Sequence, residues 1–482
     1  MPSQYPIIFG TSGHRGIIGT SFTIDHIKAI SIAIATLLNN SGTIAIGYDP
    51  REGNDPQLTP NSFTKICVDT LRSYGINVVF LTPFTPTPAV SWYVTQNHLQ
   101  GGLILTASHN PPEYNGIKFN TPDGAPADTK TTTQIEMLAN QYLQTTPPPA
   151  KKPGTLIIET AIPAFSAALH KTLTQLLGHS LTIQFPIVID AKHGTAGYCW
   201  ETLLKSTQSK LDIIHKTPDS QFGNINPNPT KIDTLTQLQH LQKTLNTPIA
   251  IANDPDSDRH VILDETGSPL TPEETTVIIG RYLLSKNIPL TEIISTVASS
   301  RLLKKFCVAH QLTYTETSVG FKYIATHLKK AKETAKIALG VESSGGFSAS
   351  FHTLEKCGFL PGMILFYLLS ETSTPLSQLK AELSGHYGHH NFQEIEFYFD
   401  PSQKQKIKDL ISQSTIQNLT QKTKLEIATL NQEDGLKIIL TNDDWLLIRL
   451  SGTEPIARIY AESNSQASTQ KLLEIGKWFL TL

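Results

Sequence analysis

Short apolar runs rich in β-branched residues alternate along the chain with longer stretches of helical periodicity. This pattern is typical of βαβ units that build a parallel or mixed sheet. In the first such unit the apolar run 43–48 precedes a helix near 59–74, and the run 102–105 leads directly to Ser108. The first unit therefore ends in a loop that presents a serine hydroxyl.

The same pattern occurs twice more along the chain. In the second unit the run 248–252 leads into an acidic loop at 254–259, and in the third the run 336–339 leads into a glycine-rich loop at 340–346. Ligands of open α/β sheets bind beyond the carboxyl ends of the strands. We therefore expect three similar domains whose loops face one cleft.

The last quarter of the chain has a different order of elements. It carries expected strands at 397–399, 437–440, 444–450 and 457–462 and expected helices near 402–411 and 466–480. The predicted fold is thus α/β, with three similar βαβ-type mixed-sheet domains and a smaller C-terminal α+β domain around a central cleft. Linkers near 145–154, 264–269 and 385–390 place the expected domains at 1–150, 151–265, 266–386 and 387–482.

Composition narrows the classes of partner. A net charge of -2 over 482 residues provides no global field for nucleic acid or an anionic membrane. The four cysteines show no CxxC spacing, which favours buried, reduced thiols. The N-terminus lacks the features of a secretory signal, and the apolar run 363–369 is too short to span a bilayer. We expect a cytoplasmic protein with a small-molecule partner.

The segment Thr106-Ala107-Ser108-His109-Asn110-Pro111-Pro112 holds Ser108 out from a turn. The two prolines fix φ and prevent a helix from continuing through the turn. An ordinary capped turn is the alternative interpretation. If the loop carries chemistry, the serine hydroxyl is the reactive group.

Asp254, Asp256 and Asp258 stand at alternate positions, and Pro255 bends the chain between them. Three carboxylates so spaced suit a small hard cation, and Mg²⁺ is the expected ion. An EF-hand is disfavoured because Arg259 occupies the place that requires glycine. A solvated acidic turn is the alternative.

Three further loops carry candidate ligand-binding residues. The segment Arg449-Leu450-Ser451-Gly452-Thr453-Glu454-Pro455 has the composition of a phosphate cradle, although a hairpin turn would also explain it. Arg15 lies among glycines in an N-terminal loop that could equally be a flexible leader. Glu342 and Ser344 suit recognition of sugar hydroxyls, and a surface turn is the alternative there.

Taken in this order, the loops resemble those of the α-D-phosphohexomutase family, which contains the phosphoglucomutases and phosphomannomutases. Residues 106–111 resemble its phosphoserine loop, 254–259 its metal loop, 342–345 its sugar loop and 449–455 its phosphate loop. The stretches 115–118 and 320–322 also match, and they are expected to bring Lys118 and Lys322 to the substrate. Gly346 stands where several mannose-accepting members carry histidine, and the Asp-Pro-Asp form of the metal loop also looks more like glucose- or pentose-phosphate members.

The resemblance implies a mechanism in which Ser108 is a phosphoserine. Mg²⁺ would be held by Ser108 and the three aspartates, and Arg15, His109 and Lys118 would stabilise the transferring group, with Lys118 or His109 taking the proton of the attacking hydroxyl. Glucose 1,6-bisphosphate would be the intermediate and activator. The residues expected to bind substrate are Arg259, Lys322, Glu342, Ser344, Arg449, Ser451, Gly452 and Thr453.

The resulting prediction is a phosphoglucomutase that interconverts α-D-glucose 1-phosphate and glucose 6-phosphate. Phosphomannomutase and phosphoglucosamine mutase are alternatives within the family. A metal-dependent phosphatase with Asp254 or Asp256 as nucleophile and a non-catalytic sugar-phosphate binding protein are alternatives from outside it. Either a monomer or a dimer is compatible with the sequence.

Overall fold

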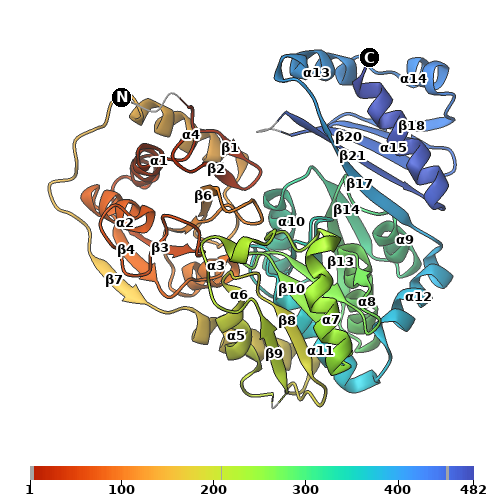
Figure 1. Cartoon of the computed structure of the whole chain (residues 1–482), viewed down its shortest axis with the longest axis horizontal. Coiled ribbons are helices and arrows are strands. Elements are labelled where there is room, and N and C mark those ends of the chain that lie inside the picture. Colours follow the sequence, from red (N-terminus) through yellow and green to blue (C-terminus); the bar gives the residue numbers. More distant parts are fainter. Residues whose placement is uncertain (1–4, 208, 452–454) are drawn as a thin grey trace.

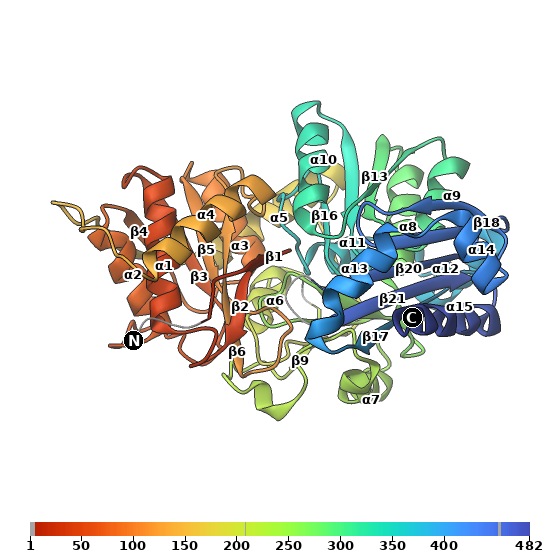
Figure 2. The ribbon, with the colours of Figure 1, turned by 90° about the horizontal axis from the view of Figure 1, so that it is seen from above.

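The computed structural model describes residues 5–207, 209–451 and 455–482, which form four sheet-based units. Figure 1 shows these units following one another in an arc, with the first, in red and orange, at one end and the fourth, in blue, at the other. Seen from above, the second and third units lie between the two ends (Figure 2). The four-unit α/β architecture predicted from the hydrophobic pattern is confirmed.

The first unit is a seven-stranded sheet of order β1-β2-β6-β5-β3-β4-β7. Its strands are β1 (Phe9–Gly10), β2 (Gly13–Ile17), β3 (Thr43–Tyr48), β4 (Asn77–Leu81), β5 (Gly101–Leu105), β6 (Tyr114–Asn120) and β7 (Leu156–Glu159), and its helices are α1 (Ile24–Leu37), α2 (Phe63–Ser73), α3 (Thr87–Gln96) and α4 (Thr129–Tyr142). The helix expected from residue 59 begins at Phe63, because the side chain of Ser62 caps it by accepting from the backbone N–H of Lys65.

The second unit contains a five-stranded sheet of order β12-β11-β10-β8-β9. Its elements are α5 (Ile162–Leu177), β8 (Ile187–Asp190), α6 (Ala196–Leu204), β9 (Leu211–Ile214), the 3₁₀ turns η1 (Phe222–Asn224) and η2 (Ile232–Leu235), α7 (Thr236–Leu245), β10 (Ala250–Asn253), β11 (His260–Leu263) and β12 (Pro269–Leu270). The expected helix 231–245 is therefore a 3₁₀ turn followed by α7, which ends where Asn246 takes the left-handed conformation.

The third unit has a four-stranded sheet of order β14-β13-β15-β16. Its elements are α8 (Pro272–Ser285), β13 (Leu290–Thr296), α9 (Leu302–Ala309), β14 (Thr313–Thr317), α10 (Phe321–Glu333), β15 (Ile337–Val341), β16 (Phe347–Ala349), α11 (Leu360–Thr372) and α12 (Leu376–Tyr387). Thr271 and Glu274 form a capping box that fixes the start of α8, with Pro272 at the first helical position.

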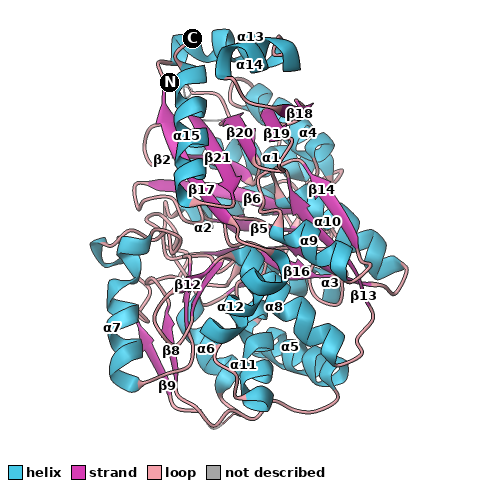
Figure 3. Ribbon diagram, turned by 90° about the vertical axis from the view of Figure 1, so that its right-hand side faces the viewer, coloured by secondary structure: helices cyan, strands magenta, loops and turns pink. Residues whose placement is uncertain are grey.

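The fourth unit is an antiparallel sheet of order β17-β21-β20-β19-β18, with helices on it (Figure 3). Its elements are β17 (Asn391–Tyr398), α13 (Lys404–Ser412), α14 (Ile416–Thr423), β18 (Ile427–Asn431), β19 (Leu436–Leu440), β20 (Trp445–Leu450), β21 (Ile456–Ser463) and α15 (Gln466–Leu480), with a 3₁₀ turn at Pro401–Gln403. The expected strand 397–399 was too short, because β17 begins six residues earlier in a polar edge segment.

The first three units share one strand arrangement that positions the predicted loops. In each, a parallel strand at the sheet centre turns back into an antiparallel neighbour: β5 into β6, β10 into β11, and β15 into β16. The serine, aspartate and glycine-rich loops are these three turns. They therefore occupy equivalent positions in the three sheets.

Apolar packing joins the first three units into one body. Trp200 of α6 packs against Phe359, with ring centroids 5.2 Å apart, and the same core cluster includes Val90 of α3 and Phe165 of α5. The strand β7 follows the proline-rich segment but pairs with β4 of the first sheet, so the boundary at residue 150 stays a prediction. No helix in the described part of the chain is long and apolar enough to cross a membrane.

Candidate active site

Ser108 lies in the turn between β5 and β6, wholly buried and in the left-handed conformation with φ of 53°. Its backbone N–H donates to Thr106 Oγ1 at 2.8 Å, and the Thr106 hydroxyl donates to Asp49 Oδ2 at 2.6 Å. The Ser108 hydroxyl donates to Asp254 Oδ2 at 2.7 Å. A non-glycine residue with positive φ stores strain, which is common at functional sites. The predicted serine and metal loops therefore meet across two units.

Arg51, which the sequence analysis did not select, hydrogen-bonds the backbone of the serine loop. It is completely buried, and its Nε lies 3.1 Å from Asp49 Oδ2. Its Nη1 donates to the carbonyls of Pro111 and Tyr114 at 2.8 and 2.9 Å, and its Nη2 donates to the carbonyls of Asn110, at 2.7 Å, and Ser108. A buried charge requires such partners. The sequence signal was an Asp-Pro-Arg segment directly after a buried strand.

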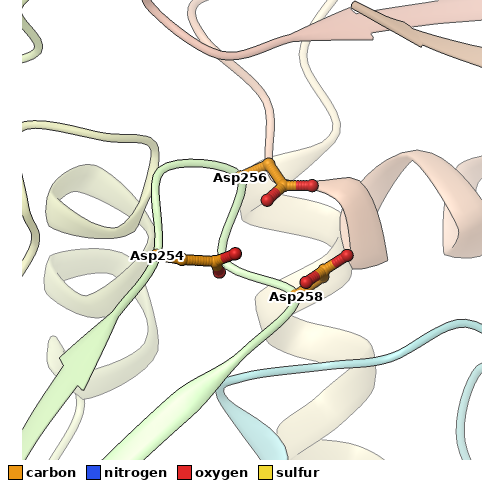
Figure 4. Close-up of side chains that lie close together, drawn as sticks. All are labelled: Asp254, Asp256 and Asp258. Carbon is orange, nitrogen blue, oxygen red and sulfur yellow. The ribbon is translucent and has the colours of Figure 1, made fainter. Parts of the chain in front are cut away.

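Asp254, Asp256 and Asp258 lie in the turn between β10 and β11, and their carboxylates face a shared space (Figure 4). One oxygen from each lies within 4.8 Å of the others, and all three residues are buried. Asp256 Oδ1 and Asp258 Oδ1 have no hydrogen-bond partner among the described residues. Unpaired buried carboxylate oxygens beside a serine hydroxyl fit the ligand set of Mg²⁺. The residues present therefore fit the predicted metal.

Burial and the neighbouring charges shift the pKa values of the aspartates in this cluster. Burial, reinforced by Asp256 and Asp258, raises the pKa of Asp254 well above its usual range. Burial also acts to raise the pKa of Asp258, but Lys118 and Lys356 outweigh it and lower that pKa strongly. Three adjacent buried carboxylates need compensating cations, so the site is built to hold positive charge.

Lys118, on β6, already pairs with this cluster. Its Nζ donates to Asp256 Oδ2 at 2.6 Å and to Asp258 Oδ2 at 2.7 Å. Burial acts to lower the pKa of Lys118, but the two aspartates outweigh it and raise that pKa. In this arrangement Lys118 is a cation. Its predicted role as proton acceptor stays a prediction.

His109 is the other candidate proton acceptor. Burial, together with the charges of Arg259, Arg15 and Arg458, lowers the pKa of His109 well below its usual value. Its Nδ1 is buried and has no hydrogen-bond partner in the described structure. The imidazole is therefore neutral at pH 7, the form that accepts a proton.

Arg15 and Arg259 supply positive charge beside the serine. Arg15 Nη1 donates to Asn110 Oδ1 at 2.8 Å, and Arg259 Nε lies 3.9 Å from Asp254 Oδ2. Burial, followed by the charge of Arg259, lowers the pKa of Arg15 to about 10. Arg15 therefore remains charged at neutral pH. This arrangement favours an anion next to Ser108.

The glycine-rich loop of the third unit touches the metal loop. The backbone N–H of His260 donates to Gly345 O at 3.1 Å, and Arg259 Nη1 donates to Ser344 O at 3.5 Å. Glu342, at the end of β15, is buried in the same loop. The structure thus brings Glu342 and Ser344 to the border of the aspartate cluster.

Lys356 was missed by the sequence analysis and lies under this loop. It is buried, and its Nζ lies 3.1 Å from Asp258 Oδ2. A Cβ on Gly346 would lie 2.5 Å from Lys356 Cδ and 3.2 Å from Glu342 Oε2. The lysine stem therefore fills the space that a larger residue at position 346 would need.

The predicted phosphate loop lies in the fourth unit. Arg449, at the end of β20, donates through Nε to Asp434 Oδ1 at 2.9 Å, and it pairs across strands with Arg458 of β21. The charge of Arg458 is one of those that lower the pKa of His109. Ser451 follows β20, while Gly452 and Thr453 lie outside the described residues.

Lys322 stands apart from the aspartate cluster in the contacts of the structure. It lies in the first turn of α10, with its Nζ 5.4 Å from the ring centroid of Tyr323. The hydroxyl of Tyr323 lies 3.3 Å from Thr129 Oγ1 of the first unit. Lys322 is thus placed where the first and third units meet, and its binding role stays a prediction.

Four family models match consecutive parts of the chain: "Phosphoglucomutase/phosphomannomutase, alpha/beta/alpha domain I" at 6–146, domain II at 166–267, domain III at 271–387 and the C-terminal domain at 404–475. A phosphoglucomutase/phosphomannomutase of Thermococcus kodakarensis is 27% identical over 476 residues, covering 97% of each chain. A phosphoglucosamine/phosphogalactosamine mutase of Sulfurisphaera tokodaii is 27% identical over 479 residues, also covering 97% of each.

The fold is shared with solved structures. A phosphoglucomutase/phosphomannomutase family protein of Burkholderia thailandensis has a TM-score of 0.77 at 20% identity, covering 98% of this chain and 97% of its own. Four domain models in order, full-length relatives and a serine beside three aspartates all agree. The protein therefore belongs to the phosphoglucomutase/phosphomannomutase family and is a phosphohexomutase, an enzyme that moves a phosphoryl group within a sugar phosphate.

Proposed function

We propose that the protein is a phosphoglucomutase that interconverts α-D-glucose 1-phosphate and glucose 6-phosphate through a phosphoserine at Ser108. The observation that carries the proposal is the 2.7 Å contact between the Ser108 hydroxyl and Asp254, inside a cluster that fits a divalent cation. A phosphoryl group on this oxygen would lie beside the aspartates, Arg15 and Arg259. Phosphoryl transfer depends mainly on such alignment and charge stabilisation.

Mg²⁺ bound by Asp254, Asp256, Asp258 and the Ser108 oxygen would neutralise charge on the phosphoryl oxygens. The phosphate already on the sugar binds at Arg449 and its loop. The free hydroxyl of the sugar then attacks the phosphorus atom on phospho-Ser108. The new sugar O–P bond forms as the Ser108 Oγ–P bond breaks, and the neutral imidazole of His109 takes the hydroxyl proton, because Lys118 is already a cation. The glucose 1,6-bisphosphate so formed reorients and returns its other phosphoryl group to Ser108.

Glucose as the substrate is supported by the surroundings of Gly346. Lys356 and Glu342 fill the space beside this glycine, at the position where the resemblance implies a histidine in several mannose-accepting enzymes. The relatives act on several sugar phosphates by their names, so the hexose must be measured. A kcat/KM for glucose 1-phosphate at least tenfold above those for the mannose and glucosamine analogues is expected, about 1.4 kcal/mol of barrier.

Ser108→Ala tests the chemistry. The variant is expected to lose mutase turnover by more than about a thousandfold, ~4 kcal/mol, whereas a phosphatase that used Asp254 or Asp256 would keep its activity. Ser166→Ala, which removes a buried hydroxyl of α5 without a hydrogen-bond partner in the described structure, is the matched control. Intact-mass measurement after incubation with glucose 1,6-bisphosphate should show one phosphoryl group on the wild type and none on Ser108→Ala. A wild type that never carries this group contradicts the proposal.

Cytoplasmic location, and the choice between monomer and dimer, stay predictions.

A further inference from the structure

A turn of the second unit carries an unusual backbone. Phe222, Gly223 and Asn224 all take positive φ, at 50°, 61° and 58°. A bulky residue such as phenylalanine rarely adopts this conformation, because its Cβ crowds the backbone. Asp219 holds the turn by accepting from the backbone N–H groups of Phe222 and Gly223, at 3.1 and 2.7 Å. Something outside the turn must require the phenylalanine ring where it lies.

The ring of Phe222 leaves its own unit and packs on Arg51 of the first. The guanidinium carbon of Arg51 lies 4.9 Å from the ring centroid, and both residues are completely buried. A cation over an aromatic face gains most when both groups are removed from water. Phe222 therefore makes a specific cation–π contact with Arg51, in addition to being an apolar residue of the interior.

The guanidinium of Arg51 also contacts the serine loop. It donates to the backbone carbonyls of Ser108, Asn110, Pro111 and Tyr114, which span the loop. A guanidinium with so many fixed acceptors has one orientation. Moving the ring beneath it would therefore shift the backbone from which the Ser108 hydroxyl extends.

The other end of the same turn is tied to the metal loop. The backbone N–H of Asp219 donates to His193 O at 3.0 Å. Two residues along, the N–H of Thr195 donates to Pro255 O at 2.8 Å, and its hydroxyl lies 2.7 Å from that of Ser257. The segment 193–195 thus contacts both the Phe222 turn and the loop that carries the three aspartates.

We propose that Phe222 is a positioning residue for phosphoryl transfer, which holds the Ser108 loop in register with the aspartate loop through Arg51. The proposal rests on the function proposed above for Ser108. The serine and the aspartates belong to different units, and their 2.7 Å contact depends on how those units are set against each other. Phe222 touches neither substrate nor metal, and it acts through the orientation of one guanidinium.

The test compares Phe222→Leu and Phe222→Met with Phe306→Leu in the full-length enzyme. Phe306 is also fully buried, but it packs against His310 and Tyr387 in the third unit. All three substitutions remove an aromatic ring, so all are expected to lower the unfolding temperature. Only the two at Phe222 are expected to lower kcat, by about tenfold or more, with the KM for glucose 1-phosphate within twofold of wild type. The Mg²⁺ concentration for half activation should rise severalfold in the same two variants.

A double-mutant cycle that combines Phe222→Leu with Arg51→Lys tests whether Phe222 acts through Arg51. If Phe222 acts through the guanidinium, Phe222→Leu should reduce kcat much less in the Arg51→Lys background than in the wild type. Equal kcat values for the Phe222 and Phe306 variants, or additive effects with Arg51→Lys, would overturn the proposal. A wild type without mutase activity would instead refute the proposed function, so the two failures are distinguishable.

Discussion

At the scale of single residues, buried charged side chains hold the backbone around Ser108 in one conformation. Arg51 and Asp49 form a fully buried ion pair, and each also hydrogen-bonds the serine loop or its neighbour Thr106. Buried ion pairs contribute little net stability, because the cost of removing both charges from water offsets their attraction. Their role here is to specify one conformation of a strained turn.

His14, beside the catalytic candidate Arg15, makes stability depend on pH. Burial lowers the pKa of His14 to about 4 from an ordinary value of 6.5, so the folded protein favours the neutral ring. The contribution of this group to stability is therefore complete above pH 6.5 and is lost as the pH falls toward 4. The shift corresponds to about 3 kcal/mol.

His14→Gln should flatten this dependence. Urea unfolding midpoints measured between pH 7 and 4.5 are expected to fall less for the variant than for the wild type. His240→Gln, an exposed position on α7, is the control and should follow the wild type. A wild-type profile that His14→Gln leaves unchanged would assign the acid sensitivity to other groups.

Which residues could be predicted depended on where their partners lie in the sequence. Ser108 and the three aspartates were selected as candidates because each follows an apolar strand in a local polar loop. Phe222 and Lys356 were not, because their partners are a guanidinium and a carboxylate supplied by distant segments. The local Asp-Pro-Arg segment at Arg51 gave no indication of the distant carbonyls that Arg51 binds. A local pattern contains no signal for such contacts.

At the scale of elements, the alternation of apolar runs located the strands that carry the site, since β3, β5, β10 and β15 all lie at or near their expected positions. It failed for β17, whose polar residues alternate in exposure along a sheet edge and do not form an apolar run. Buried central strands are therefore easier to predict from sequence than edge strands. The positions of the serine, aspartate and glycine-rich loops were predictable because these loops follow central strands.

The loop between β8 and α6 supports the metal loop directly. A Cβ on Gly194 would lie 2.4 Å from Pro255 Cα and 2.5 Å from Pro255 O, both backbone atoms that cannot move independently. Gly194→Ala is expected to displace the aspartates and to raise the Mg²⁺ concentration for half activation about tenfold. Mg²⁺ titrations of initial rate provide the measurement.

Gly385→Ala is the control for this change, because a Cβ at that position meets nothing within 4 Å. It should leave Mg²⁺ activation as in the wild type. If Gly194→Ala behaves in the same way, the metal loop does not depend on close packing against this glycine.

At the scale of the whole molecule, the first three units share a core, whereas the fourth has a core of its own and meets the third through a small apolar cluster that includes Val297 and Trp445. A buried carboxylate lies beside this apolar contact and hydrogen-bonds both units. Glu462 of β21 is wholly buried and accepts from Trp445 Nε1 at 2.9 Å, from the backbone N–H of Arg301 at 2.9 Å, and from Ser300 Oγ at 3.1 Å. The sequence predicted a fourth domain, but it held no signal for this junction.

His390, in the connection between the two units, also contacts Glu462 through Nδ1. Burial acts to raise the pKa of Glu462, but His390 and Arg301 outweigh it and lower that pKa, so the carboxylate is charged. Glu462→Gln removes this charge while it keeps the shape of the side chain. The fourth unit should then sample more orientations and carry Arg449 out of register with Ser108.

The expected result for Glu462→Gln is a KM for glucose 1-phosphate raised about tenfold, with Ser108 still phosphorylated by glucose 1,6-bisphosphate. Faster proteolysis in the connection at 388–390 should accompany it. Glu474→Gln, on the exposed face of α15, is the matched control and should change neither quantity. If Glu462→Gln lowers kcat and phosphoserine content but leaves KM unchanged, the junction acts on the chemistry at Ser108 and does not serve to position the fourth unit for substrate binding.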